Sequence, residues 1–408
     1  MKFKSIKLSL LASILVFSAS CSSDDDNTTP QDTVVTKALV KSNYANIVYQ
    51  SYSDSHISAV ALQTAVNTFL ADKTEANFNA VKLAWLEARE IYGQTEAYRE
   101  CNGPIDTEGQ PWSLGTEGQI NAWPIEEAYI DYVQAGTEGS GGGTFDSSII
   151  ADESINIEAQ ILADLNEAND NAAAISTGWH AIEFLLWGQD NSAPVDNQAG
   201  QRVYTDYTTA DNAERRSEYL QVVTNLLVSD MQDLVATWNT GGAYRTFFAA
   251  LDEDIALKQA INGAFFIAGD ELSSERMIAP VDSDGGLNQT GQEDEHSCFA
   301  DNTHRDIVAN AQGVYNVIFG KYGTTEGASF YNLVKQEDAT QAAKLKAAAD
   351  LAMDKVNAIA NNAQPFDYLI TQEQSTDNPQ GPVMQAVKAL QDLADEISAS
   401  ATVVGINL

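Results

Sequence analysis

Positively charged side chains are scarce in this sequence. Its 408 residues include 22 lysines and arginines against 58 aspartates and glutamates, so the formal net charge is −36. A chain with so negative a field does not bind nucleic acid or an anionic lipid surface through its overall charge. It attracts cations, but acidic charge spread over a surface usually contacts only solvent, so the total supports metal binding weakly.

Cysteine and long apolar runs are also rare. Of the three cysteines, Cys21 lies near the start, and Cys101 and Cys298 are separated by almost two hundred residues. In an exported protein these two could form a disulfide or remain buried thiols, and the spacing leaves both options open. After Cys21, no apolar run is long enough to cross a bilayer.

Two widespread enzyme motifs are missing. The sequence has no Gly-x-Ser-x-Gly nucleophile elbow and no glycine-rich phosphate-binding loop that ends in Gly-Lys-Ser or Gly-Lys-Thr. The serine, cysteine and histidine residues do not combine into a recognisable nucleophilic triad. Phosphoryl transfer and dinucleotide chemistry are therefore not expected.

The first residues have the pattern of an export signal. A basic start precedes an apolar stretch at 8–19 that is too short to cross a bilayer, so residues 1–20 are predicted to be a signal peptide. Ser18-Ala19-Ser20-Cys21 resembles a lipoprotein cleavage box and would place a lipid on Cys21. The polar, acidic residues 21–36 would be the tether. We expect an outer-membrane lipoprotein, facing the periplasm or exposed at the cell surface.

Helical periodicity dominates the remaining chain. Apolar residues recur every three or four positions, and the strict alternation of β-strands is almost absent, so the fold class is all-α. A polar loop at 189–212 predicts two helical bundles, at 37–195 and 205–408. Further loops are expected at 103–118, 136–143 and 282–295. Helices are expected at 37–52, 56–70, 75–98, 153–174, 177–187, 213–238, 247–277, 302–319, 337–360 and 382–399.

One acidic residue interrupts the apolar run of Gly178-Trp179-His180-Ala181-Ile182-Glu183-Phe184-Leu185-Leu186-Trp187-Gly188. An unpaired carboxylate on such a helix face costs several kcal/mol to bury, so Glu183 needs a cation, a metal ion or a proton. His180 lies three residues earlier on the same side of the helix turn. The two side chains predict half of a metal site, and a hydrogen-bonded structural pair is the alternative.

A later segment also concentrates possible ligands. Glu293-Asp294-Glu295-His296-Ser297-Cys298-Phe299-Ala300-Asp301-Asn302-Thr303-His304 holds four carboxylates and two imidazoles, which suit a hard or borderline divalent ion or Fe(III). Asp301 or Asn302 could instead cap the next helix, and His296 could be a surface residue. The segment is a candidate second half of the site.

A third candidate ligand ends the helix expected at 75–98. Glu96 lies near Arg89, and both are at helical spacing from the apolar stripe that includes Trp85 and Tyr92. Glu96 could point a third carboxylate toward His180 and Glu183. The alternative is an Arg–Glu pair on one helix.

Together these segments resemble the imelysin family, which is also peptidase family M75. The order of the similar blocks is kept from about Lys37 to the C-terminus. The blocks are Trp85-Leu86-Glu87-Ala88-Arg89 with Tyr92-Gly93-Gln94-Thr95-Glu96-Ala97, Gly103-Pro104-Ile105-Asp106 with Ile120-Asn121-Ala122-Trp123-Pro124, the Gly-x-His-x-x-Glu hallmark in Gly178–Gly188, and Asp294-Glu295-His296-Ser297-Cys298-Phe299 with Asp301–His304.

The resemblance implies two helical bundles related by an ancient duplication, with the Gly-x-His-x-x-Glu helix near their interface. It also implies a bacterial envelope protein tied to iron acquisition. The expected cofactor is a divalent or trivalent metal ion, with iron favoured and zinc or calcium as alternatives. The expected metal ligands are His180, Glu183 and Glu96, with a second tier of Glu295, His296, Asp301 and Arg89.

Three functions follow from these expectations. The first is a lipid-anchored protein that binds a metal cation near an iron transporter or receptor. The second is a metallopeptidase of the M75 type, which is disfavoured because catalytic zinc usually needs three protein ligands, an open position and a general base, whereas the motif supplies only His180 and Glu183. The third is a non-catalytic interaction protein in which these two residues form a structural pair.

Overall fold

Long amphipathic helices build the fold. The computed structural model describes residues 34–134, 147–284, 291–375 and 380–408. Within these ranges the only sheet is one short antiparallel hairpin of β1 (Lys321–Tyr322) and β2 (Thr325–Glu326), so the all-α prediction is confirmed. The long helices are α1 (Lys37–Ala71), α2 (Glu75–Tyr92), α7 (Ala213–Trp238), α11 (Thr303–Phe319), α13 (Ala339–Ala360) and α15 (Pro382–Val403).

Shorter helices connect these and carry most of the functional side chains. The α-helices among them are α3 (Glu117–Asn121), α4 (Glu127–Ile130), α5 (Ala159–Asp164), α6 (Gly178–Trp187), α8 (Ala243–Ala250), α9 (Glu253–Phe266), α10 (Ala279–Asp284), α12 (Phe330–Glu337) and α14 (Phe366–Thr371). The 3₁₀ turns are η1 (Gly93–Tyr98), η2 (Ala168–Asp170), η3 (Pro194–Asp196), η4 (Tyr204–Tyr207) and η6 (Gly291–Asp294), and η5 (Ile267–Ile278) is π-helical.

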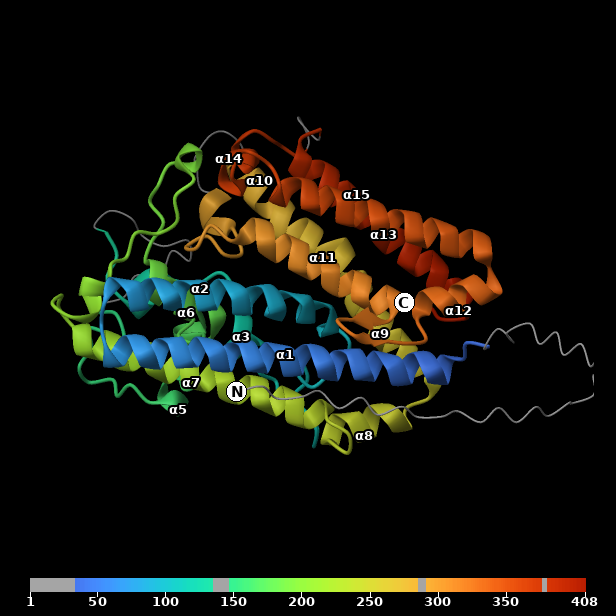
Figure 1. Ribbon diagram of the computed structural model, residues 1–408, viewed down its shortest axis with the longest axis horizontal. Helices are drawn as coiled ribbons and strands as arrows, with labels where there is room; N and C mark the ends of the chain where they lie inside the picture. The colour runs from blue at the N-terminus through green and yellow to red at the C-terminus, as the bar shows by residue number, and fades with distance from the viewer. Residues whose placement is uncertain (1–33, 135–146, 285–290, 376–379) are drawn as a thin grey trace, which may run out of the picture. The chain divides into compact units, whose positions relative to one another are not determined.

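The long helices lie in two groups. Figure 1 shows α1, α2 and α7 side by side, and α13 and α15 form a second pair that packs on α11 and η5. α11 also contacts η1 and α2, so it joins the two groups. Residues 35–408 form one compact unit. The division into bundles at 37–195 and 205–408, and their duplication, stay predictions.

The α2 helix shows why the periodicity was informative. Its apolar stripe is buried as expected, and Thr74 caps the helix by accepting a hydrogen bond from the N–H of Asn77 at 3.3 Å. The helix ends at Tyr92, and η1 continues it in tighter 3₁₀ geometry to Tyr98. This change of pitch turns Glu96 toward the interior. The buried stripe is Phe78, Val81, Trp85, Ala88 and Tyr92.

The helix expected at 153–174 is largely wrong. Only α5 is α-helical there, and Glu167, Asn169 and Asp170 have φ values of 56°, 60° and 59°. This left-handed backbone cannot continue a right-handed helix, and short polar side chains such as Asn and Asp tolerate it. The helices expected at 37–52 and 56–70 are one continuous helix, α1.

Several other expectations concern the cysteines and the chain ends. Cys101 and Cys298 are both buried free thiols, so the two are not joined by a disulfide. The signal peptide at 1–20, the lipid on Cys21 and most of the tether at 21–36 lie outside the described residues, as does the loop at 136–143. None of the helices in the described ranges is both long and apolar enough to cross a membrane.

Candidate functional site

Helix α6 begins at a glycine because the backbone there leaves no room for a side chain. Gly178 has a φ of +85°, and a Cβ atom at this position would lie 2.4 Å from the carbonyl oxygen of Ile120 in α3. Glycine therefore permits α3 to pack directly on the start of α6. His180 and Glu183 follow within one turn, and both side chains are fully buried.

His180 and Glu183 form a hydrogen-bonded pair. Nδ1 of His180 lies 3.0 Å from Oε2 of Glu183, and Oε1 of Glu183 accepts the backbone N–H of Ala300 at 2.9 Å. Burial, together with the cation of Arg89, lowers the pKa of His180 well below 6.5, and burial raises the pKa of Glu183. The imidazole is therefore neutral, and both oxygens of Glu183 have partners in the protein.

The guanidinium of Arg89 is the cation nearest to this pair. Its Nη2 lies 3.4 Å from Nε2 of His180 and 3.2 Å from Oδ2 of Asp306 on α11. Nη1 of Arg89 donates a hydrogen bond to the side chain of Asn121. The salt bridge of Arg89 thus goes to Asp306 rather than to Glu96, the partner considered from the sequence.

His296 stands beside His180, with ring centroids 5.0 Å apart. Both ring nitrogens of His296 lie 3.3 Å from Nη2 of Arg89, so this guanidinium nitrogen is not aligned with the one lone pair of a neutral ring. Burial lowers the pKa of His296 well below 6.5, and the cations of Arg276 and Arg89 lower it further. His296 is therefore a buried, neutral imidazole, not a surface residue.

Glu96 is enclosed by donors. Its Oε2 accepts hydrogen bonds from Arg276 at 2.8 Å and Arg99 at 3.0 Å, and its Oε1 accepts one from Asn121 at 3.1 Å. Burial alone would raise the pKa of Glu96, but Arg276 and Arg99 outweigh it and hold this pKa well below 4.5. Glu96 is a charged carboxylate that orients two arginines.

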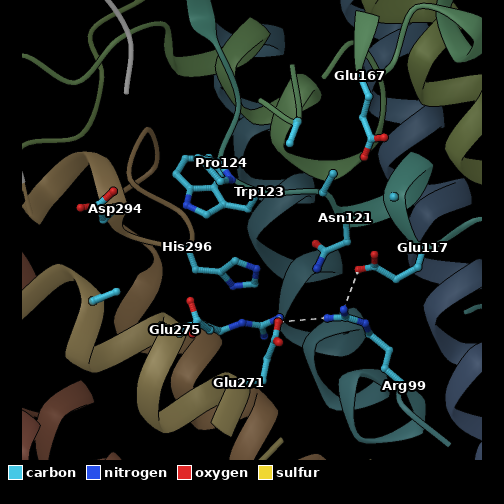
Figure 2. A pocket seen from close by; sticks show the side chains of 15 residues that line it. Arg99, Glu117, Asn121, Trp123, Pro124, Glu167, Glu271, Glu275, Asp294 and His296 are labelled. Atoms are coloured by element: carbon cyan, nitrogen blue, oxygen red, sulfur yellow. Dashed lines mark hydrogen bonds and ion pairs between the residues drawn. The ribbon is translucent and has the colours of Figure 1, made fainter. Parts of the chain in front are cut away.

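A pocket of about 430 Å³ opens beside this network. Figure 2 shows His296 and Asn121 pointing into it, with the indole of Trp123 above and Arg99 below. Arg99 pairs with two of the acidic lining residues at 3.2 Å. Because carboxylates outnumber guanidinium groups in the lining, the pocket favours a cation. Its acidic residues are Glu117, Glu167, Glu271, Glu275 and Asp294, and its basic residues are Arg99 and Arg276.

The structure separates two predicted ligands from the others. Glu295 and Asp301 do not line the pocket. Asp301 lies with Asp190 and Asp367, and the Glu295 carboxyl faces that of Asp367. Of Glu295, His296 and Asp301, which the sequence placed in one group, only His296 lines the pocket.

Sequence reasoning missed three residues that organise the site. Asn121 lies within the Ile120–Pro124 block that carried part of the resemblance, so its position was a usable signal. Asp306 directly precedes the apolar Ile307 and Val308 but follows the polar His304 and Arg305, so its signal is weaker than that of Glu183. Arg276 had no comparable signal, because no apolar run surrounds it and it directly follows the acidic Glu275.

The lining of the pocket, which includes His296, offers ligand types that a metal ion takes. Neutral imidazole and carboxylate are ligand types that iron and zinc take. The space between His180 and His296 already holds the positively charged guanidinium of Arg89, so it does not need a metal ion. In the pocket, Glu275 and Asp294 form no salt bridge with any described residue, so their carboxylates are available to an incoming cation.

The structure is thus that of a helical protein that encloses a His-x-x-Glu pair beside an acidic pocket. The chain belongs to the imelysin family, because the family model for imelysin, peptidase M75, matches residues 48–397.

Two proteins that this chain resembles are both described as iron-regulated protein A or its precursor. Iron-regulated protein A of Synechococcus elongatus is 22% identical over 299 residues, which are 71% of this chain and 65% of that protein. The chain thus spans just under two thirds of this relative. The crystal structure of a protein described as an iron-regulated protein A precursor, from Parabacteroides distasonis, superposes with a TM-score of 0.67 at 19% identity, covering 92% of this chain and 97% of the other. This chain and the Parabacteroides distasonis protein share their fold.

Proposed function

We propose that this protein is an envelope lipoprotein that binds a metal cation, with iron favoured, and takes part in iron acquisition. The observation that carries the proposal is the buried imidazole of His296 at the wall of an acidic pocket. A neutral imidazole offers a lone pair to a metal ion without losing a proton. The family and the names of the two relatives support iron as the ion.

In this proposal the buried pair supports the site. Asp294 and Glu275 surround the pocket near His296, and their negative charge would balance the ion (Figure 2). The guanidinium of Arg89 contacts the rings of both His180 and His296, and Glu183 fixes the His180 ring through Nδ1. The ion would be cargo that is passed to a transporter or receptor, to which the lipid on Cys21 would keep the protein close.

The geometry favours binding over peptide hydrolysis. Glu183 is fully buried, and both of its oxygens have partners in the protein, so it has no free oxygen with which to activate water. Glu96 is likewise engaged by two arginines and an amide. Neither acid is placed as the general base of a metallopeptidase.

Replacement of His296 tests this function. The variant His296→Ala should bind Fe(II) under anaerobic conditions, and Zn(II), at least about tenfold more weakly than the wild type, since an imidazole ligand is lost. Calorimetric titration of chelator-treated protein measures the affinity. His56→Ala is the matched control, because His56 lies on α1 away from the pocket lining, and it should bind as the wild type does.

Two results would contradict the proposal. One is a wild-type protein that binds neither ion. The other is a folded His296→Ala variant, with unchanged circular dichroism, whose affinity equals that of the wild type.

A further inference from the structure

Four carboxyl groups, three of them buried and that of Asp301 half-buried, meet outside the pocket. Asp190 follows α6, Asp301 precedes α11, and Asp367 lies on α14, and one carboxylate oxygen from each lies within 4.8 Å of the others. The fourth group is Glu295, whose carboxyl faces that of Asp367. We call these four residues the carboxylate cluster. Its members come from three distant parts of the chain.

The negative charge of this cluster has no protein cation to balance it. Within the described ranges, none of the four acids forms a salt bridge with lysine or arginine. Glu295 is 0% exposed, and its carboxyl interacts with the side chains of Asp367 and Thr303, but neither of its oxygens there accepts a hydrogen bond of good geometry. One oxygen of Asp301 and one of Asp367 are unsatisfied in the same way. Unpaired buried acceptors of this kind are rare because each costs free energy.

Asp190 is positioned by two hydrogen-bond donors. Its Oδ2 accepts a hydrogen bond from Nε2 of Gln292 at 2.7 Å, and its Oδ1 accepts the backbone N–H of Ser192 at 2.9 Å. These bonds hold the Asp190 carboxylate toward Asp301 and Asp367 rather than neutralising it. The cluster is therefore partly preorganised.

Carboxyl groups this close cannot all be ionised in a buried site without a counter-charge. Burial, aided by the neighbouring acids, raises the pKa of Asp301 to about 9, and burial raises the pKa of Asp367 to about 6. The cluster must either retain protons or hold a cation.

We propose that the carboxylate cluster binds a hard divalent cation of the calcium type, separate from the ion in the pocket. Its donors are all oxygens, without histidine or cysteine, as hard cations prefer. Calcium takes oxygen ligands at about 2.3–2.6 Å, so ligands on opposite sides of the ion are about 4.6–5.2 Å apart. The ligand oxygens of Asp190, Asp301 and Asp367 are no more than 4.8 Å apart, so one ion could contact all three.

An ion in the cluster would join elements that are remote in sequence. Asp190 continues from α6, Asp367 belongs to α14, and Glu295 and Asp301 lie in the segment between η6 and α11. That segment also carries Ala300, whose N–H donates to Glu183. The cation would thus be structural, and it would fix the segment that supplies His296.

Calcium titration of the chelator-treated full chain tests this inference. The wild type should bind one Ca²⁺ with a rise of several degrees in melting temperature, because the ion binds only the folded cluster. Asp367→Asn should bind Ca²⁺ at least tenfold more weakly. Asp230→Asn is the matched control, since Asp230 is also a buried acid with a raised pKa but lies on α7 and accepts from Gln119. It should bind Ca²⁺ as the wild type does.

Two outcomes would overturn the inference. In one, the chelator-treated wild type shows neither binding heat nor a higher melting temperature with Ca²⁺, Mg²⁺ or Mn²⁺, which means that protons alone neutralise the cluster. In the other, Ca²⁺ binds equally well to the wild type, Asp367→Asn and a second variant, Glu295→Gln. His296→Ala should keep calcium binding while losing iron binding, so the two proposals can fail independently.

Discussion

Burial decides which single residues titrate in an unusual range, and Asp230 is a simple example. It is 7% exposed on α7 and accepts a hydrogen bond from Nε2 of Gln119 at 2.8 Å. Burial raises its pKa to about 6. The folded state therefore binds more protons than the unfolded state between pH 4 and 6, and this group lowers stability as the pH rises through that range.

Asp230→Asn should remove this loss of folding stability at rising pH. The amide keeps an oxygen that accepts from Gln119 but carries no charge, so the variant should be more stable than the wild type at pH 7 by roughly 2 kcal/mol. Melting temperatures measured from pH 4 to 8 should diverge up to about pH 6 and then run parallel. A difference in melting temperature between the two proteins that stays constant from pH 4 to 8 would contradict the raised pKa of Asp230.

The site could be predicted at the residue scale only in part. Glu183 was identified because it is an acid within an apolar run. The same argument applies to Asp367 in Phe366-Asp367-Tyr368-Leu369-Ile370. The sequence did not show which acids meet, because Asp190 and Asp367 come from distant segments. Nor could it show that Arg89 places its charge between two imidazoles, since that depends on how α2 packs on α6 and α11.

At the scale of elements, the start of α6 is a sensitive position. Gly178→Ala adds a Cβ atom to a residue with a φ of +85° and brings it 2.4 Å from the carbonyl oxygen of Ile120. Left-handed strain of about 1–3 kcal/mol adds to this clash, so unfolding in denaturant should show a loss of at least about 2 kcal/mol. His180 and Glu183 would move with the helix, so metal affinity should fall as well.

Gly118→Ala is the control for that substitution. Gly118 lies in α3 with open space where its Cβ would be. Alanine favours the helix over glycine by up to about 1 kcal/mol, so this variant should be as stable as the wild type or slightly more stable. Equal losses in both variants would show that α3 packing, rather than the backbone of Gly178, limits stability.

The prediction of elements succeeded where one face is apolar and failed where the backbone turns left-handed. The helix expected at 213–238 is α7 with the same bounds, since its buried residues keep one stripe. The helix expected at 153–174 stops after Asp164. The polar residues from Glu167 to Asp170 allow a left-handed backbone, and helical periodicity does not report on that property.

At the scale of the whole molecule, the net charge of −36 opposes compaction. Sodium chloride should therefore raise the melting temperature between about 20 and 300 mM, because the Debye length falls below about 10 Å and repulsion between surface acids is screened. Scanning calorimetry measures this rise. It should be the same in Asp367→Asn, which would lose only the response to calcium. A melting temperature that falls with salt would contradict the argument.

Neighbouring residues of one short segment face different surroundings, because His296 lines the pocket while Glu295 belongs to the carboxylate cluster. If calcium in the carboxylate cluster strengthens the affinity of the pocket for iron, thermodynamic reciprocity requires that iron in the pocket strengthens the affinity of the cluster for calcium by the same factor. A protein built in this way would load iron in a calcium-rich medium and release it more readily where calcium is scarce.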